Sequence, residues 1–204
     1  MKLSFSTKGW HTPTFEQFCE AAEDLRFQGI ELHNIYNRLF TDKDGAFHDY
    51  AAAATRRRLY EKGLDIPCID TVCDASAGVT DCAVEEITRC LSIAAILGIP
   101  YVRLKAADAE DRGAAIARVG ELVESVLPAA REEGVALLIE TSGLFASTAA
   151  LRDVLDSFAS DHVAALWHWS AAYFDGGESP EQVIKNLGAS VRHVHVSDAK
   201  AAAD

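Results

Sequence analysis

Short apolar segments alternate along this chain with longer segments whose apolar residues recur at helical spacing, and this alternation narrows the folds it can adopt. Seven segments predict strands, at residues 3–6, 30–33, 66–71, 101–104, 135–139, 163–167 and 191–196. Successive segments begin roughly 25 to 36 residues apart, which leaves room for a helix between each pair. Because a parallel crossover needs such a helix, the pattern predicts an α/β fold with a parallel sheet.

Capping residues indicate where several helices begin and end. Thr14, with Gln17 three positions later, is typical of a capping box, and Ser179-Pro180 is typical of an N-cap followed by the first helical position. Gly29 and Gly98 follow helical segments, and glycine readily adopts the left-handed conformation that ends many helices. We therefore expect these two glycines to terminate helices.

Two architectures fit this alternation, a doubly wound sheet and a (β/α)8 barrel. No GxGxxG or Walker sequence follows any strand, which removes the main argument for a nucleotide-binding doubly wound fold. A barrel would instead gather the residues that follow its strands at one mouth. Polar residues cluster at these positions: Glu31, His33, Asp70, Arg103, Lys105, Glu140, His168, His195 and Asp198. The chain is interpreted as a single TIM-type barrel domain over residues 1–204.

Seven strands are one short of a closed barrel, and strands at an open edge leave backbone groups unpaired. Residues 199–204, after the last predicted strand, are too few for a further helix and strand. Three explanations fit: a truncated chain or gene, a naturally reduced barrel, or closure by another chain. The third predicts a homo-oligomer, which a strictly monomeric mass at micromolar concentration would contradict.

Composition argues against several classes of protein. The formal net charge is -12, and the basic run Arg56-Arg57-Arg58 lies in a predicted helix beside Glu61, so nucleic-acid binding is not expected. No apolar run approaches the ~20 residues of a membrane-spanning helix. The five cysteines lack CxxC spacing and no secretory leader is found, so we expect a cytoplasmic protein with reduced thiols.

Five stretches, in order along the chain, resemble the xylose-isomerase-like TIM barrels, specifically the sugar phosphate isomerase/epimerase group. They are Leu3-Ser4-Phe5-Ser6-Thr7, Phe27-Gln28-Gly29-Ile30-Glu31-Leu32, Gly134-Val135-Ala136-Leu137-Leu138-Ile139-Glu140, Gly177-Glu178-Ser179-Pro180-Glu181 and Arg192-His193-Val194-His195-Val196-Ser197-Asp198. The resemblance covers essentially the whole chain. It implies a divalent metal (Mn, Co, Zn or Mg), a sugar or sugar phosphate as substrate, and glutamates that move a proton next to a carbonyl.

The resemblance also implies particular metal ligands. Members of this family use a Glu after strand five, an Asp after strand six, a His from an HxH strand and a Glu after strand eight. Glu140 matches the first and His195 the third, while His168 stands where the Asp is usual. Histidine can ligate a divalent ion, although it favours softer metals than a carboxylate does. Ser170 and Ala171 replace a histidine that is often found shortly after that Asp, and a match to the fourth ligand would lie beyond residue 204.

Each candidate residue also has a structural explanation. A buried Glu140 carboxylate, implied as metal ligand and acid/base, needs a partner, which a salt bridge to Arg103 or Lys105 would provide. Alternatively, Arg103 or Lys105 points into the barrel mouth and holds a substrate hydroxyl or phosphate. His168 has flanking tryptophans and fits a packed aromatic pocket as well as a ligand role. His193 has the same strand phase as His195 and is interpreted as structural.

Two further residues are weaker candidates for substrate binding. His33 is the last residue of the predicted strand 30–33 and shares a face of that strand with Glu31, two positions earlier. Trp10 follows the first predicted strand and could wall a sugar pocket, although aromatic residues at strand ends more often contribute to packing.

The sequence therefore predicts a metal-dependent isomerase or epimerase of a sugar or sugar phosphate. The alternative is a degenerate barrel that acts as a non-catalytic sugar-binding or partner subunit. His168, Ser170, Ala171 and the missing eighth strand motivate this alternative. A third interpretation, the endonuclease branch of the same fold, conflicts with the acidic charge.

Overall fold

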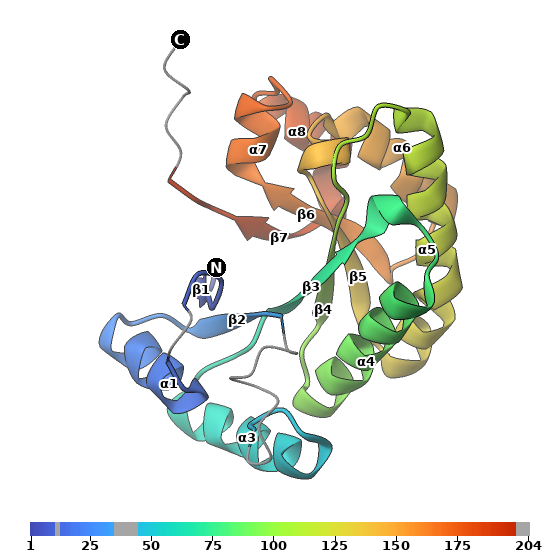
Figure 1. Ribbon diagram of the computed structural model, residues 1–204. Helices are drawn as coiled ribbons and strands as arrows, with labels where there is room; N and C mark the ends of the chain where they lie inside the picture. The colour runs from blue at the N-terminus through green and yellow to red at the C-terminus, as the bar shows by residue number, and fades with distance from the viewer. Residues whose placement is uncertain (11–12, 35–44, 199–204) are drawn as a thin grey trace.

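The computed structural model describes residues 1–10, 13–34 and 45–198 and contains one parallel seven-stranded sheet. Its strands follow chain order: β1 Ser4–Ser6, β2 Gly29–His33, β3 Cys68–Asp74, β4 Tyr101–Lys105, β5 Ala136–Glu140, β6 Val163–His168 and β7 Val191–His195. In the described sheet, β1 and β7 have one neighbour each. Figure 1 shows the sheet curled into an open barrel, with β1 and β7 on either side of the opening. The predicted TIM-type barrel with seven strands is confirmed.

Helices connect the strands and lie on the outside of the sheet (Figure 1). They are α1 Phe15–Asp24, α3 Asp49–Lys62, α4 Asp81–Leu97, α5 Arg112–Glu133, α6 Thr148–Phe158, α7 Trp169–Phe174 and α8 Pro180–Leu187, with short 3-10 turns η1 Ala75–Ala77, η2 Gly143–Phe145 and η3 Gly188–Ser190. Within the described ranges, none of the helices combines the length and apolar character needed to cross a bilayer. Residues 11–12, 35–44 and 199–204 lie outside the described residues.

The helix-end signals are confirmed with one exception. Thr14 forms the predicted capping box of α1, and Gly98 ends α4 in the left-handed conformation with a φ of 73°. The prediction that Gly29 terminates α1 is wrong, because α1 ends at Asp24 with Leu25 as its C-cap and Gly29 opens β2. A Cβ at Gly29 would lie 2.8 Å from the carbonyl oxygen of Asp65. Glycine is therefore needed there for the close approach of two backbone segments.

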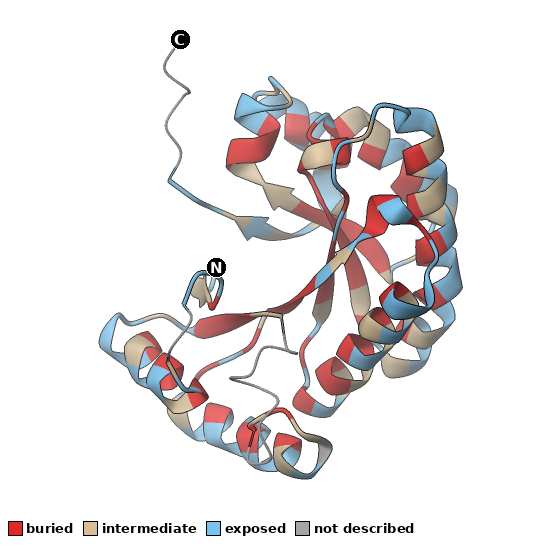
Figure 2. Ribbon diagram, in the orientation of Figure 1, coloured by how far each residue is buried: buried red, intermediate tan, exposed pale blue. Residues whose placement is uncertain are grey.

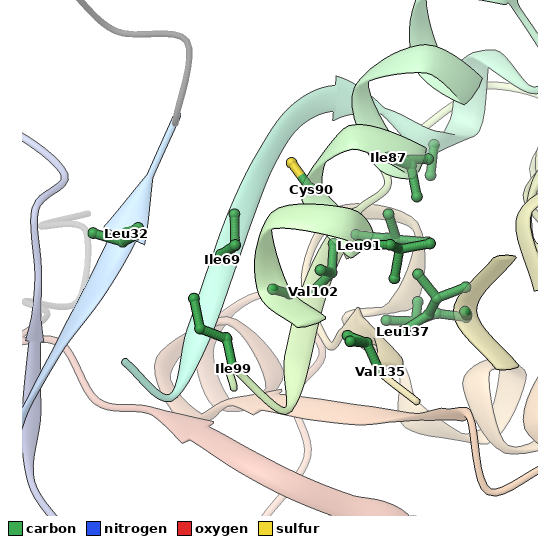
Figure 3. Packing of buried hydrophobic residues seen from close by; sticks show 14 of the residues in the cluster. Leu32, Ile69, Ile87, Cys90, Leu91, Ile99, Val102, Val135 and Leu137 are labelled. Atoms are coloured by element: carbon green, nitrogen blue, oxygen red, sulfur yellow. The ribbon is translucent and has the colours of Figure 1, made fainter. Parts of the chain in front are cut away.

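The main hydrophobic core lies between the sheet and its helices. Figure 2 shows buried residues concentrated along the strands and on the helix faces that cover them. In Figure 3, Ile87 and Leu91 of α4 pack near Val102 of β4 and Leu137 of β5. Each fully buried side chain of this size contributes about 1.5–3 kcal/mol of hydrophobic stabilisation. This layer holds the strands in register and leaves their opposite faces to form the barrel interior.

The barrel interior contains a second, smaller apolar cluster. It consists of Leu138, Ala164 and Leu166, with Tyr101 packed against it. Leu138 points inward because its strand neighbours Leu137 and Ile139 belong to the outer core. The interior positions nearest this cluster are polar, and they form the candidate site.

Candidate functional site

The strands carry a group of ionisable side chains into the barrel interior. On β4, Val102 and Leu104 belong to the outer core, so Arg103 between them faces inward. The same alternation places Glu140 inside at the end of β5, two residues after Leu138. We call the whole group the central cluster: Glu31, Asp70, Arg103, Glu140, His193 and His195. Its carboxylates and guanidinium are at most 4% exposed, so each charge needs a partner inside the protein.

Arg103 connects two carboxylates across three neighbouring strands. Its Nη1 lies 2.7 Å from Oδ2 of Asp70 on β3, and its Nε lies 2.5 Å from Oε2 of Glu140 on β5. The salt bridge proposed from the sequence as an alternative for Glu140 is therefore present and uses Arg103. Lys105, the other candidate cation, is exposed at the end of β4.

Glu140 has further partners beside Arg103. The hydroxyl of Ser142 donates a 2.6 Å hydrogen bond to Oε1, and Nδ1 of His195 lies 3.3 Å from Oε2. Burial raises the pKa of the Glu140 carboxyl, but the contacts with His195, Arg103 and Ser142 outweigh burial and hold this pKa well below its ordinary value. Glu140 is consequently a carboxylate throughout the neutral range.

Glu31 on β2 meets both histidines of β7. Nε2 of His193 lies 2.8 Å from the Glu31 carboxylate, and Nε2 of His195 lies 2.9 Å from it. Burial raises the pKa of Glu31, but its hydrogen bonds with the two imidazoles lower it overall, from an ordinary value of 4.5 to about 2. The three side chains therefore form one hydrogen-bonded unit between β2 and β7.

His195 bridges two carboxylates through its two ring nitrogens. Nε2 faces Glu31 and Nδ1 faces Glu140. Burial lowers the pKa of His195, but hydrogen bonding to Glu140 and Glu31 and their charges raise it overall, from 6.5 to about 9. An imidazolium at this position donates a hydrogen bond to Glu31 through Nε2 and offsets part of the negative charge of both acids.

His168 lies at the junction between β6 and α7. Its side chain caps α7, with Nδ1 accepting a 3.4 Å hydrogen bond from the backbone N–H of Ala171. The hydroxyl of Ser170 lies 3.3 Å from the same nitrogen, and the His168 ring stands edge-to-face to that of His195, with centroids 5.9 Å apart. Burial lowers the pKa of His168, which keeps the imidazole neutral. Its role as a metal ligand stays a prediction.

The remaining sequence candidates lie around the central cluster. His33, at the end of β2, has Nδ1 3.4 Å from Oδ2 of Asp70. Trp10 is 43% exposed and packs against Phe5 and Phe18, with ring centroids 5.7 and 5.8 Å away. Trp10 therefore makes the packing contacts that were expected of an aromatic residue at a strand end. Neither residue contacts Glu140 through any hydrogen bond or ion pair of the described chain.

Two groups of three side chains in the described ranges bring potential metal-ligand atoms within 4.8 Å of one another. One consists of Glu31, His193 and His195, and the other of Glu31, Cys68 and Asp70. The first offers one carboxylate and two imidazoles, a donor set suited to zinc and similar ions. The residues therefore fit a divalent metal, but the converging set shares only His195 with the ligands implied by the resemblance.

A cavity of about 890 Å³ borders the central cluster at His193. Its walls include Ser4 of β1 and Val194 of β7, the two strands at the open side of the barrel. The cavity also reaches Pro67 and Pro100, which precede β3 and β4. It thus opens toward the N-terminal ends of the strands, whereas the active sites of TIM barrels lie at the C-terminal ends.

The contact between His193 and Glu31 was not predicted from the sequence, which interpreted His193 as structural and mentioned Glu31 only among the polar residues at strand ends and beside His33. Two signals could have indicated them. His193 and His195 share one face of a strand, and Glu31 interrupts the buried run Ile30–Leu32, where a charged residue needs a compensating partner. No sequence signal identified each as the partner of the other.

A family model described as "Xylose isomerase-like TIM barrel" matches residues 19–204. No curated protein sequence matches the chain.

Several solved structures have the same fold at low sequence identity. A D-psicose 3-epimerase, determined in the presence of D-fructose, has a TM-score of 0.77 at 17% identity, covering 96% of this chain and 72% of that one. The 3-keto-D-glucoside 4-epimerase YcjR from E. coli has a TM-score of 0.77 at 14% identity, with 97% and 79% covered. The IOLI protein with a zinc atom has a TM-score of 0.76 at 13% identity, with 94% and 70% covered.

Proposed function

The chain belongs to the xylose isomerase-like TIM barrel family, and on this basis we propose that it is an isomerase or epimerase of a sugar or sugar phosphate. The observation that carries the proposal is the Glu140 carboxylate, which is buried at the C-terminal end of β5 and has His195 beside it. Active sites of TIM barrels lie at this end of the strands. The two epimerases among the similar structures support the substrate class.

In this proposal Glu140 is the acid/base that moves a proton on the carbon next to the sugar carbonyl. Return of the proton by Glu140 to the neighbouring carbon, with a proton shift between the two substrate oxygens, gives isomerisation. Epimerisation needs a second acid, which protonates the same carbon from the opposite face while Glu140 keeps the proton that it removed. Arg103 and His195 lower the proton affinity of Glu140. A substrate that loosens either contact would raise the pKa of Glu140 toward the range of an effective base.

The proposed enzyme uses a divalent metal. The resemblance implies Glu140, His168 and His195 as its ligands, of which Glu140 and His195 lie side by side. When bound, such an ion would polarise the sugar carbonyl and make the adjacent carbon more acidic.

Substrate oxygens are proposed to bind at the C-terminal ends of β2 and β4. Lys105 is exposed at the end of β4, and the side chain of His33 is 27% exposed at the end of β2. Arg103 is already shared between Asp70 and Glu140, so its contact with substrate would require one of these ion pairs to open. Trp10 is proposed as a more distant wall of the sugar site.

One observation favours a second function, a non-catalytic sugar-binding module. Arg103 pairs with both Asp70 and Glu140, so part of their buried negative charge is neutralised by the protein itself. A barrel in which Arg103 holds Glu140 in this way could bind sugars at its mouth without moving a proton.

The test is solvent exchange followed by proton NMR. The full chain would be incubated in D₂O with ketoses, aldoses and their phosphates, in the presence of Mn²⁺, Co²⁺, Zn²⁺ or Mg²⁺. We expect deuterium to appear at the carbon next to the carbonyl with wild-type protein and not with Glu140→Gln. Glu121→Gln, an exposed position on α5, is the matched control. Calorimetric sugar binding without deuterium exchange would establish the binding module instead.

A further inference from the structure

The ligand atoms that converge in the structure differ from the ligand set implied by the resemblance. We propose that Glu31, His193 and His195 bind one divalent transition metal ion, such as zinc or cobalt. Glu140 and His168 lie outside this set. The site does not depend on the proposed isomerase function, because its test is metal binding rather than turnover.

The geometry of the three side chains suits one ion. Both imidazole Nε2 atoms face the Glu31 carboxylate, at 2.8 Å for His193 and 2.9 Å for His195. Zinc bonds nitrogen and oxygen at about 2.0–2.2 Å, which places neighbouring ligand atoms of a tetrahedron about 3.3 Å apart. The two nitrogen–oxygen contacts need to open by about half an ångström to admit an ion.

The orientation of His195 favours an ion bound between His195 and Glu31 over an ion bound between His195 and Glu140. One imidazole cannot direct both ring nitrogens at the same ion, and the two nitrogens of His195 face different carboxylates. Metal-binding histidines commonly donate their other N–H to a carboxylate, which fixes the ring and its tautomer. Glu140, 3.3 Å from Nδ1, is placed to hold His195 in this way while Nε2 binds the ion.

The positive charge of Arg103 also favours an ion bound at Glu31 over one bound at Glu140. The guanidinium of Arg103 lies 2.5 Å from Oε2 of Glu140, the oxygen that faces His195. A cation bound at that oxygen would be repelled by Arg103. The ion pairs found for Glu31 in the described chain are with the two histidines alone, which can bind a metal in their neutral form.

The second group of potential ligands, which also contains Glu31, is less suitable. Cys68 is completely buried, and its thiol hydrogen bonds the carbonyl oxygen of Ile69. Burial holds the pKa of Cys68 well above its ordinary value, whereas a metal ligand must be a thiolate. Asp70 is engaged by Arg103. The group of Glu31, His193 and His195 is therefore the favoured metal site.

An ion also has a route to the proposed site. The side chains of His193 and His195 are 17% and 19% exposed, whereas that of Glu31 is 3% exposed. His193 lines the cavity of about 890 Å³ at the open side of the barrel. The ion would reach Glu31 from this cavity, past the histidines.

Metal titration of the full chain tests the assignment. Metal-free protein would be titrated with Co²⁺, followed by visible absorption and by mass spectrometry of retained metal. Loss of a ligand in Glu31→Gln or His193→Asn should weaken Co²⁺ binding by more than ~100-fold, beyond the ~10–100-fold cost of losing an orienting partner. His162→Asn, at a histidine that contacts the carbonyl oxygen of Val135 and lies outside the central cluster, is the control and should change the affinity less than threefold. His168→Asn, in which asparagine preserves the N-cap of α7, distinguishes this ligand set from the one implied by the resemblance.

Other outcomes overturn the proposal. They are an absence of stoichiometric Co²⁺ binding to wild-type protein, retained binding in His193→Asn, or an equal loss in His168→Asn. Circular dichroism of the metal-free variants checks that each one folds.

If a variant fails to fold, the metal ligands can still be identified in the wild-type protein. Protein labelled with ¹⁵N-histidine and loaded with ¹¹³Cd²⁺ should show cadmium coupling to Nε2 of two histidines, and His195 should be one of them. Coupling to Nδ1 of His195, or to His168, would overturn the assignment.

Discussion

Nδ1 of His195 on β7 lies 3.3 Å from Oε2 of Glu140 on β5, while Nε2 of the same ring lies 2.9 Å from Glu31 on β2. This one side chain therefore divides the central cluster into two sides. On one side, Glu140 is paired with Arg103, and on the other, Glu31 is paired with His193. The two sides have different charge environments. We expect proton transfer at Glu140 and metal binding at Glu31.

Replacement of Arg103 should destabilise the fold strongly. Arg103→Met removes the cation between two buried carboxylates, and such uncompensated charges typically cost about 3–5 kcal/mol in the free energy of unfolding. Lys105→Met, two residues along the same strand but exposed, should change it by about 0.5 kcal/mol or less. Urea unfolding measures both, and equal effects would contradict the ion-pair role of Arg103.

Replacement of Glu140 tests the proposed proton transfer. Glu140→Gln keeps the size of the side chain but cannot accept the substrate proton. We expect the rate of solvent-deuterium exchange to fall by about 10²–10⁴-fold, the usual contribution of a general acid or base. The metal-free variant should remain folded by circular dichroism. A loss below about tenfold would remove Glu140 from this role.

The stability of the fold should depend on pH through His195 and Glu31. The folded-state pKa of His195 is raised from 6.5 to about 9, so its contribution is fully present below pH 6.5 and is lost as the pH rises through 9. The pKa of Glu31 is lowered from 4.5 to about 2, so its contribution is present above pH 4.5 and is lost as the pH falls through 2.

These two contributions overlap between pH 4.5 and 6.5, where we expect the central cluster to stabilise the fold most. Urea unfolding across the pH range measures the dependence. In His195→Gln the alkaline decline should flatten. An unchanged decline in that variant would assign the dependence to other groups.

Gly143 should be intolerant of a side chain. Its φ is +54°, and a Cβ there would lie well inside van der Waals contact with the carbonyl oxygen of Ala106. Gly134, with a φ of +66° and open space around its Cβ position, is the matched control. Gly134→Ala should cost about 1 kcal/mol for its backbone strain, and Gly143→Ala should cost clearly more.

The position of Gly143 gives this substitution a second consequence. Gly143 follows Ser142, whose hydroxyl bonds Glu140, so Gly143→Ala should also disturb the site. Thermal unfolding compares the two alanine variants, and equal midpoints would contradict the predicted clash.

The sequence by itself determined the β/α alternation, most helix ends and the inward phase of the site residues. These depend on local periodicity and capping, which a few neighbouring residues decide. Through the family resemblance it also predicted that Glu140 and His195 lie together, and it offered Arg103 or Lys105 as the alternative salt-bridge partner of Glu140. Gly29 was misassigned because its requirement comes from the backbone of Asp65, a contact outside its own segment.

Only the tertiary structure decided which inward side chains meet. Glu31 and His193 are 162 positions apart and lie on strands that do not pair with each other. Their contact depends on the curvature of the whole sheet, which sums small twists and tilts over seven strands. Strand phase predicts that a side chain points inward, but the curvature of the sheet determines which side chain it meets.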